Sequence, residues 1–282
     1  MTPLLRPNPH FLTIPKRLAS RQVLDNNYVI PDGRVLRIQR AEPEDKDALF
    51  TFYRDNFSVQ EPISRYLKIT FEDLEGAFYG PIFDMALKQG LSTAAYDGDK
   101  LVGVSIVTLN PVEQRTLLVP QNEFGIDADK YAKQLGTSVN GGILYSLLMH
   151  GEAISVSLLP EEITHLVRAE AGSVSPDYRG ADVRRKLAIE SAKLAASEGY
   201  EVIDTLCSAT ASTKVMGDCG LVTRHKMVYK DMTYHGKPIF PTPLHDDNTS
   251  MNVMQGSIKD LSTLECPKES TIQKYKKRMA RN

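Results

Sequence analysis

The chain has 282 residues and a formal net charge of −1, with 34 Lys and Arg against 35 Asp and Glu. Hydrophobic residues make up 41% of it, which is enough to build a core and excludes a disordered chain. The balanced charge argues against a general nucleic-acid coat protein, whose affinity depends on excess basic charge. No apolar run approaches the roughly 18 residues that a membrane helix needs. We therefore expect neither a nucleic acid nor a membrane as partner.

The cysteines and the first residues indicate the compartment. Cys207, Cys219 and Cys266 are odd in number and form no CxxC pair, so the sequence indicates neither a disulfide framework nor a zinc site. The first ten residues lack the charged-then-apolar pattern of a signal peptide. These features predict a cytoplasmic protein without a metal.

The two ends of the chain differ from its middle. Residues 1–33 contain five prolines and little periodicity, which predicts an N-terminal arm. Residues 241–282 are polar, and the last fifteen hold six basic residues against one acidic residue. Such runs are typical of a solvated tail, with a docking role as the alternative. We expect one domain at 34–240.

The middle of the chain alternates strand and helix signals. Asp97-Gly98-Asp99 is a strong hairpin signal between two β-rich runs, and Gly141-Gly142 is expected to interrupt a helix. Alternating elements with one antiparallel hairpin predict a mixed-sheet α/β or α+β domain. The expected strands are 34–40, 92–96, 101–109, 164–174, 201–207 and 224–234, and the expected helices are 41–57, 61–67, 73–90, 131–152, 181–197 and 212–219.

The segment 173–187 is the candidate for chemistry. A strand ends at Val174, a Ser-Pro-Asp turn follows, and Arg179-Gly180 opens an amphipathic helix. The free N–H groups and the dipole of a helix start form an anion site, and a glycine lets a phosphate approach the backbone. An ordinary strand-turn-helix connection explains the same residues equally well. Basic side chains for further phosphates lie one turn on: Arg184, Arg185 and Lys186.

The sequence Val174-Ser-Pro-Asp-Tyr-Arg179-Gly180, followed by a helix, resembles the acetyl-CoA loop of the GNAT superfamily of N-acetyltransferases. The pattern continues with a strand through Cys207, a short helix ending at 218–221, and a strand ending at Val228-Tyr229. Leu221 stands where the family has phenylalanine. Upstream, residues 56–63 (Asn-Phe-Ser-Val-Gln-Glu-Pro-Ile) resemble a signature of the invertebrate arylalkylamine N-acetyltransferase-like branch. The resemblance covers about 35–234.

This resemblance implies a fold and a donor site. The fold is a mixed, mostly antiparallel central sheet with a splayed parallel strand pair and helices on both faces. The pantetheine arm of acetyl-CoA would pair with the free edge of the strand ending at Val174, through backbone groups of Ser173 and Val174. The Val174 N–H would polarise the thioester carbonyl. The pyrophosphate would lie on the N–H groups of Arg179, Gly180, Ala181, Asp182, Val183 and Arg184.

The loop departs from the family at two positions. Where the family has a glycine, and then a glycine or alanine, this chain has Asp182 and Arg184. An aspartate adds repulsion against a pyrophosphate, or it points away and favours the helix dipole. Arg184 adds both bulk and a cation. Acetyl-CoA binding is retained, weakened or lost on these residues alone.

Catalysis needs a proton acceptor, because an alkylamine with a pKa near that of lysine, about 10.4, is protonated at neutral pH. The resemblance favours Glu61, although an acid before Pro62 is also a typical helix-start residue. The leaving thiolate needs a proton donor, and Met216 stands where many members have a tyrosine. Ser208 and Ser212 are the remaining candidates, and a helix N-cap is the alternative for either.

Other reactive residues are weaker candidates. His150 and His165 are expected to be structural or surface residues, and Cys207 is expected to be a buried thiol without a histidine partner. Tyr145 and Met149 belong to the core or line the amine pocket.

Together the sequence predicts an acetyl-CoA-dependent N-acetyltransferase that acts on a small primary amine, an arylalkylamine, by direct attack in a ternary complex. A pocket richer in acids would favour polyamines instead. The alternative from another class is a non-catalytic GNAT-like module that binds an acyl-CoA or a partner.

Overall fold

The computed structural model describes residues 22–58, 60–112, 121–240 and 243–279. An eight-stranded sheet runs through the protein in the order β1-β2-β3-β4-β5-β6-β10-β7. Neighbouring strands are antiparallel except β5 and β6. The strands are β1 (Val23–Val29), β2 (Val35–Arg40), β3 (Thr93–Asp97), β4 (Lys100–Pro111), β5 (His165–Val174), β6 (Val202–Cys207), β7 (Val222–Val228) and β10 (Ser250–Ser257).

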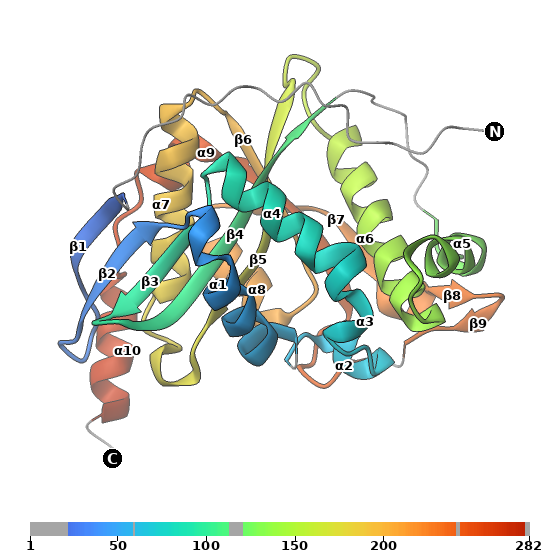
Figure 1. The fold of residues 1–282 in the computed structure, drawn as a ribbon, viewed down its shortest axis with the longest axis horizontal. Helices are drawn as coiled ribbons and strands as arrows, with labels where there is room; N and C mark the ends of the chain where they lie inside the picture. Colours follow the sequence, from blue (N-terminus) through green and yellow to red (C-terminus); the bar gives the residue numbers. More distant parts are fainter. Residues whose placement is uncertain (1–21, 59, 113–120, 241–242, 280–282) are drawn as a thin grey trace.

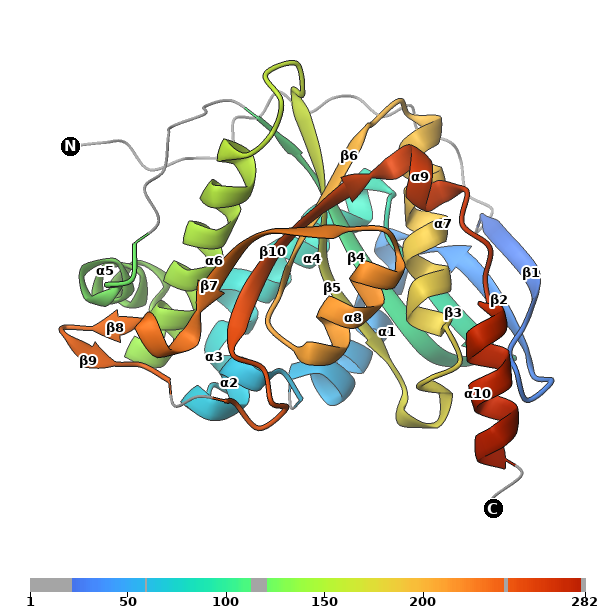
Figure 2. The ribbon, with the colours of Figure 1, turned by 180° about the vertical axis from the view of Figure 1, so that it is seen from behind.

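Helices cover both faces of this sheet (Figure 1). The first face carries α1 (Lys46–Tyr53), α2 (Pro62–Leu67), α3 (Glu72–Leu74), α4 (Gly80–Gln89), α5 (Gly125–Leu135) and α6 (Val139–Ser157). The opposite face carries α7 (Val183–Ser197), α8 (Thr210–Asp218) and α9 (Ile258–Ser262), and α10 (Glu269–Met279) follows at the C-terminal end (Figure 2). The predicted fold class, a mostly antiparallel sheet with one parallel pair and two helical layers, is confirmed.

The start of α7 is held close to the sheet by a glycine. A β-carbon at Gly103 on β4 would lie 3.1 Å from Leu187 Cδ1 and 3.2 Å from Val183 Cγ1. The apolar side of α7 therefore packs directly on β4, and both side chains are buried. This contact fixes the loop before α7 beside the end of β5.

The predicted helix 131–152 is two helices, and its break lies before the expected one. Gly136 ends α5 in the left-handed region, at φ +63°, and Ser138 caps α6 by accepting a hydrogen bond from the Gly141 N–H at 3.2 Å. Gly142 lies inside α6, where a β-carbon would collide with the Ala128 carbonyl of α5. Gly141-Gly142 therefore does not interrupt the helix, and Gly142 permits close packing of α6 on α5.

The predicted domain limits need correction at both ends. Residues 23–29, expected in the N-terminal arm, form β1 and pair with β2; the arm before residue 22 lies outside the described residues. Residues 250–257, expected in a polar tail, form β10 between β6 and β7. The last strand expected before 240 is β7 followed by a separate hairpin of β8 (Thr233–Tyr234) and β9 (Lys237–Pro238).

A hydrophobicity pattern does not reveal strand β10, because several of its buried side chains are polar and hydrogen-bonded. Asn252 donates to Thr213 Oγ1 at 3.0 Å and accepts from Ser250 Oγ at 3.1 Å. Gln255 donates to the Ser155 carbonyl of α6 at 2.7 Å. Buried polar groups with such bonds carry little penalty, so the strand is as polar as a tail and still interior.

Candidate active site

The parallel strands β5 and β6 separate near their middle. They pair only at Val167 with Ile203 and at Arg168 with Asp204. Beyond these pairs a cleft of about 680 Å³ opens, lined by residues 169–174 of β5 and by residues 205–208 at the end of β6. The splayed strand pair that the resemblance implied is therefore present at the predicted place.

A β-bulge accompanies this separation. Ile106 of β4 pairs with Ala171 and Val107 pairs with Ala169, so Glu170 is an extra residue on β5. A bulge bends the strand and redirects its side chain. The Glu170 carboxylate accepts a hydrogen bond from Thr108 Oγ1 at 2.5 Å, on the first face of the sheet.

The free edge of β5 presents the backbone of Val174 to the cleft. The Ser175 N–H donates to the Val102 carbonyl of β4 at 2.9 Å. Because successive residues of a strand point their backbone groups to opposite sides, Ser173 faces β4 while Gly172 and Val174 face the cleft. This alternation of backbone groups along β5 contradicts the prediction that backbone groups of Ser173 face the cleft.

The loop between β5 and α7 has left-handed backbone at two residues, Gly180 at φ +77° and Asp182 at φ +59°. The Lys186 N–H makes the first helical bond, to the Asp182 carbonyl at 2.8 Å, so the N–H groups just before it have no partner within the helix. Asp182 Oδ2 accepts from the Lys268 N–H at 2.8 Å. Of the two alternatives for this aspartate, the structure shows the carboxylate turned to the C-terminal segment.

Two arginines lie along the free edge of β5. Arg179 Nε donates to the Val174 carbonyl at 3.0 Å. Arg184 lies over Gly172, where a β-carbon would collide with its guanidinium, and its Nη1 donates to Ser105 Oγ at 3.0 Å.

The other two basic residues expected to meet phosphates are structural. Arg185 is buried and donates to the carbonyls of Asp218 and Glu265. Lys186 is buried and forms ion pairs with Asp25 and Glu190, both at 2.7 Å. Both side chains are therefore bound to groups of the protein itself, and the sequence alone does not reveal these partners.

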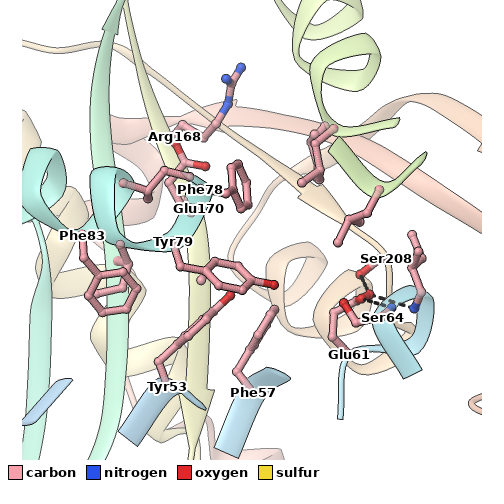
Figure 3. A pocket seen from close by; sticks show the side chains of 18 of the residues that line it. Tyr53, Phe57, Glu61, Ser64, Phe78, Tyr79, Phe83, Arg168, Glu170 and Ser208 are labelled. Atoms are coloured by element: carbon pink, nitrogen blue, oxygen red, sulfur yellow. Dashed lines mark hydrogen bonds between the residues drawn. The ribbon is translucent and has the colours of Figure 1, made fainter. Parts of the chain in front are cut away.

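A second, smaller cavity of about 80 Å³ lies on the first face of the sheet (Figure 3). The aromatic part of its wall is close-packed, and the rings of Tyr53 and Phe57 stack with centroids 4.6 Å apart. The cavity and the cleft share part of their wall, including Glu61, Glu170 and Ser208. The aromatic lining residues are Tyr53, Phe57, Phe78, Tyr79 and Phe83, and the acidic ones are Glu61, Glu152 and Glu170.

Glu61 and Ser208 meet in this shared wall (Figure 3). Ser208 Oγ donates to Glu61 Oε1 at 2.6 Å, across 147 residues of sequence. Glu61 is also the N-cap of α2, because its oxygens accept the N–H groups of Ile63 at 3.1 Å and Ser64 at 2.6 Å. The helix-start role and the contact with Ser208 therefore hold together.

Ser208 is fixed from behind by two residues that the sequence did not single out. The Tyr229 hydroxyl and the Asn248 amide donate to the Ser208 carbonyl, at 2.9 Å and 2.6 Å. Tyr229 is fully buried and Asn248 is 8% exposed. Neither had a detectable signal, because both lie in segments whose contacts depend on the position of β10.

Ser212 does not join this pair. Helix α8 begins at Thr210, so Ser208 precedes it and the two serines are not one helical turn apart. Ser212 Oγ donates to the Ala209 carbonyl at 2.8 Å and accepts from the Ala209 N–H at 3.3 Å. Ser212 lines the cleft, and the alternative role of helix N-cap is also wrong for it, because Ala209 is the N-cap of α8 and Ser212 lies three residues further on.

A cluster of buried and half-buried charged residues lies beside the shared wall. Arg168 contacts Glu152 Oε2 at 2.6 Å and Asp204 Oδ2 at 2.8 Å. Burial, together with repulsion from Glu152, raises the pKa of Glu170 to about 8, although Arg168 opposes the shift. Burial raises the pKa of Glu152 as well, again against Arg168. The sequence analysis missed Glu170, whose signal was a charge inside an apolar strand.

The weaker candidates take structural positions. Burial lowers the pKa of His150, which accepts from the Gln121 N–H at 3.1 Å, and His165 contacts Thr164. Burial raises the pKa of Cys207 to about 11 and that of Tyr145 above its usual value. Met216 is buried and has no proton to donate.

Comparisons with known proteins show which fold this arrangement of strands and helices has. No protein-family model and no curated protein matches the chain. The crystal structure of arylalkylamine N-acetyltransferase 2 from Aedes aegypti superposes with a TM-score of 0.62 at 17% identity, over 79% of this chain and 99% of the other. The chain has the GNAT fold.

Two further GNAT-fold structures are similar over a comparable length. Polyamine N-acetyltransferase of Drosophila melanogaster, an enzyme that forms N-acetylagmatine, has a TM-score of 0.59 at 14% identity, over 78% of this chain and 97% of that one. The C-terminal condensation domain of Ebony, in complex with β-alanyl-dopamine, has a TM-score of 0.59 at 11% identity, over 79% and 98%.

No helix in the described ranges is both long and apolar enough to span a membrane. Among these same residues, no group of three or more His, Cys, Asp and Glu side chains is arranged to hold a metal.

Proposed function

We propose that the protein is an acetyl-CoA-dependent N-acetyltransferase whose acceptor is an arylalkylamine. The observation that carries the proposal is the Glu61–Ser208 pair, which lies in a wall shared by the cleft and the aromatic cavity. The cleft runs along the free edge of β5 and is open, whereas the cavity is lined by aromatic rings. A donor in the cleft and an amine in the cavity would meet at this pair.

The residues of the cleft fit acetyl-CoA. The Gly172 and Val174 backbone offers an extended arm the pairing of an added strand. The N–H groups at the start of α7 suit a pyrophosphate, and the Asp182 carboxylate is turned toward Lys268. Arg179, which donates to the Val174 carbonyl, adds a cation on this edge.

The proposed mechanism uses the shared wall for proton transfer. The Ser208 hydroxyl gives its only proton to the bond with Glu61, so its lone pairs are free to accept a proton from the amine. Proton transfer from the amine to Ser208, and from Ser208 to Glu61, leaves a neutral nucleophile. The Val174 N–H then donates to the thioester oxygen as negative charge develops there.

The cavity wall supports the acceptor class. Aromatic rings beside carboxylates suit an aryl group that carries an ammonium ion. The extra acids Glu152 and Glu170 favour a second candidate, an acceptor with two cationic groups such as a polyamine. The similarity to an arylalkylamine and to a polyamine N-acetyltransferase supports both classes alike.

The test is release of free CoA from acetyl-CoA with single amines. Phenylethylamines should give a higher kcat/KM than spermidine or agmatine. The Glu61→Gln variant should lose activity toward them. Glu162→Gln, at an exposed residue outside both spaces, is the matched control. A higher kcat/KM for spermidine would select the second class. Binding of acetyl-CoA without release in any mixture would refute an enzyme and favour a binding module.

A further inference from the structure

The side chain of Arg184 turns away from the expected phosphate position and lies on the sheet. Its guanidinium occupies the space that Gly172 leaves free, and Nη1 donates to Ser105 Oγ at 3.0 Å. Ser105 is fully buried and lies on the α7 face, because its neighbour Thr93 donates to the Leu187 carbonyl of α7 at 3.0 Å. The arginine therefore enters the cleft from the side of α7.

Arg184 is a cation without an anion. No carboxylate among the described residues forms an ion pair with it, whereas Lys186 and Lys193 on the same helix are paired with acids. Burial lowers the pKa of Arg184, and among the described residues the thiols of Cys219 and Cys207 oppose this shift. Burial raises the pKa of each of these thiols to about 11, so both are neutral at physiological pH. A half-buried guanidinium without an ion-pair partner is stabilised when an anion binds beside it.

The position of Arg184 identifies that anion. Gly172 and Val174 are the residues whose backbone faces the cleft, and the guanidinium lies over Gly172, so a thioester held by the Val174 N–H lies within about 7 Å of it along the strand. The Glu61–Ser208 pair and the aromatic cavity lie on the opposite face of the sheet, with Glu170. An amine attacking from that side pushes the leaving sulfur toward α7 and Arg184.

We propose, on the basis of the function proposed above, that Arg184 is a catalytic residue that stabilises the departing CoA thiolate. The amine nitrogen forms a bond to the acyl carbon, the C–S bond breaks, and its electron pair stays on sulfur. The first ammonium proton goes through Ser208 to Glu61 before the attack, and the second, lost from nitrogen as the amide forms, passes to water. The guanidinium keeps its protons and donates a hydrogen bond to the sulfur, which takes a proton from water on release. Met216 supplies no donor here.

The competing possibility is that Arg184 only obstructs the cleft. The two ideas make opposite predictions for the same substitution. If Arg184 stabilises the thiolate, Arg184→Met lowers kcat about a hundredfold, in the range found for removing one transition-state donor, with little change in the dissociation constant for CoA. If it obstructs, the same variant binds CoA more tightly and reacts at least as fast.

The decisive experiment needs no turnover. The thiol of protein-bound CoA is titrated by ultraviolet absorbance of its thiolate, with the complex of desulfo-CoA subtracted to remove the protein's own thiols. In the wild type the pKa of the bound thiol should fall by at least about one unit below the value near 8.5 of a free thiol, a tenfold gain in thiolate. Arg184→Met should abolish the shift and Arg184→Lys should keep part of it.

Arg224→Met, at an exposed arginine on β7, is the matched control and should keep the full shift. Equal thiol pKa values in the wild type and Arg184→Met, with both melting at the wild-type temperature, would overturn the proposal. So would tighter CoA binding by Arg184→Met. Failure of the wild type to bind CoA would refute this inference and the donor proposed above together. A shifted thiol in a protein that acetylates no amine would refute only the proposed function.

Discussion

Replacing Glu61 by glutamine separates its two roles. The carboxylate accepts three hydrogen bonds, from the Ile63 N–H, the Ser64 N–H and the Ser208 hydroxyl, at 3.1, 2.6 and 2.6 Å. The single amide oxygen of glutamine can keep two of these, and its NH₂ group then faces the third donor. We expect a loss of about 1–2 kcal/mol in the free energy of unfolding, the cost of one unsatisfied donor. Activity should fall much further, by about 10²–10⁴-fold, because the proton acceptor is gone.

The assay pairs urea unfolding with kcat/KM for one amine. Ser208→Ala is the companion variant: it removes the relay and leaves the cap of α2 intact, so it should lower activity with a loss of at most about 1 kcal/mol in stability. If Glu61→Gln kept wild-type kcat/KM while losing stability, Glu61 would be only a helix cap. The proton acceptor would then have to be sought elsewhere, beginning with Glu170.

Three further predictions follow from single contacts. The pKa of Glu170 is raised from 4.5 to about 8 on folding, so the folded state binds this proton more tightly than the unfolded state. Thermal melts should therefore show the wild type losing stability relative to Glu170→Gln as the pH rises from 4.5 to about 8. Melting temperatures of the two proteins that change in parallel with pH would contradict the assignment. Gly172→Ala should displace the flexible Arg184 guanidinium from Ser105, at a cost of about 1 kcal/mol or less, and the same change in an Arg184→Ala chain should cost less still; equal losses in the two chains would show that the two residues do not touch. A chain ending at residue 240 should give no cooperative melt in circular dichroism, because β10 lies between β6 and β7, and a native-like melt would contradict that topology.

The elements that the sequence predicts well are those whose signal is local. The strand ending at Val174, the turn after it and the helix that becomes α7 follow from periodicity and from Arg179-Gly180. The hairpin at Asp97-Gly98-Asp99 joins β3 and β4 as expected. Each of these features is decided within about fifteen residues.

The features that escape prediction depend on partners far away in the chain. Strand β10 can bury its polar side chains because Asn252 and Gln255 find acceptors on α8 and α6. Ser208 and Glu61 lie 147 residues apart in the sequence, so spacing could not predict their contact and paired Ser208 with Ser212. Arg185 and Lys186 look like free cations until Asp25, Glu190 and two carbonyls are placed beside them.

The central claim is that an acetyl group moves from a donor in the β5–β6 cleft to an amine in the aromatic cavity. The most direct measurement is mass spectrometry of the amine after incubation with isotopically labelled acetyl-CoA and the full-length protein. We predict labelled acetyl on an arylalkylamine nitrogen with the wild type, and its loss with Glu61→Gln but not with Glu162→Gln. Unlabelled amine from the wild type, under conditions where calorimetry shows acetyl-CoA bound, would contradict the claim.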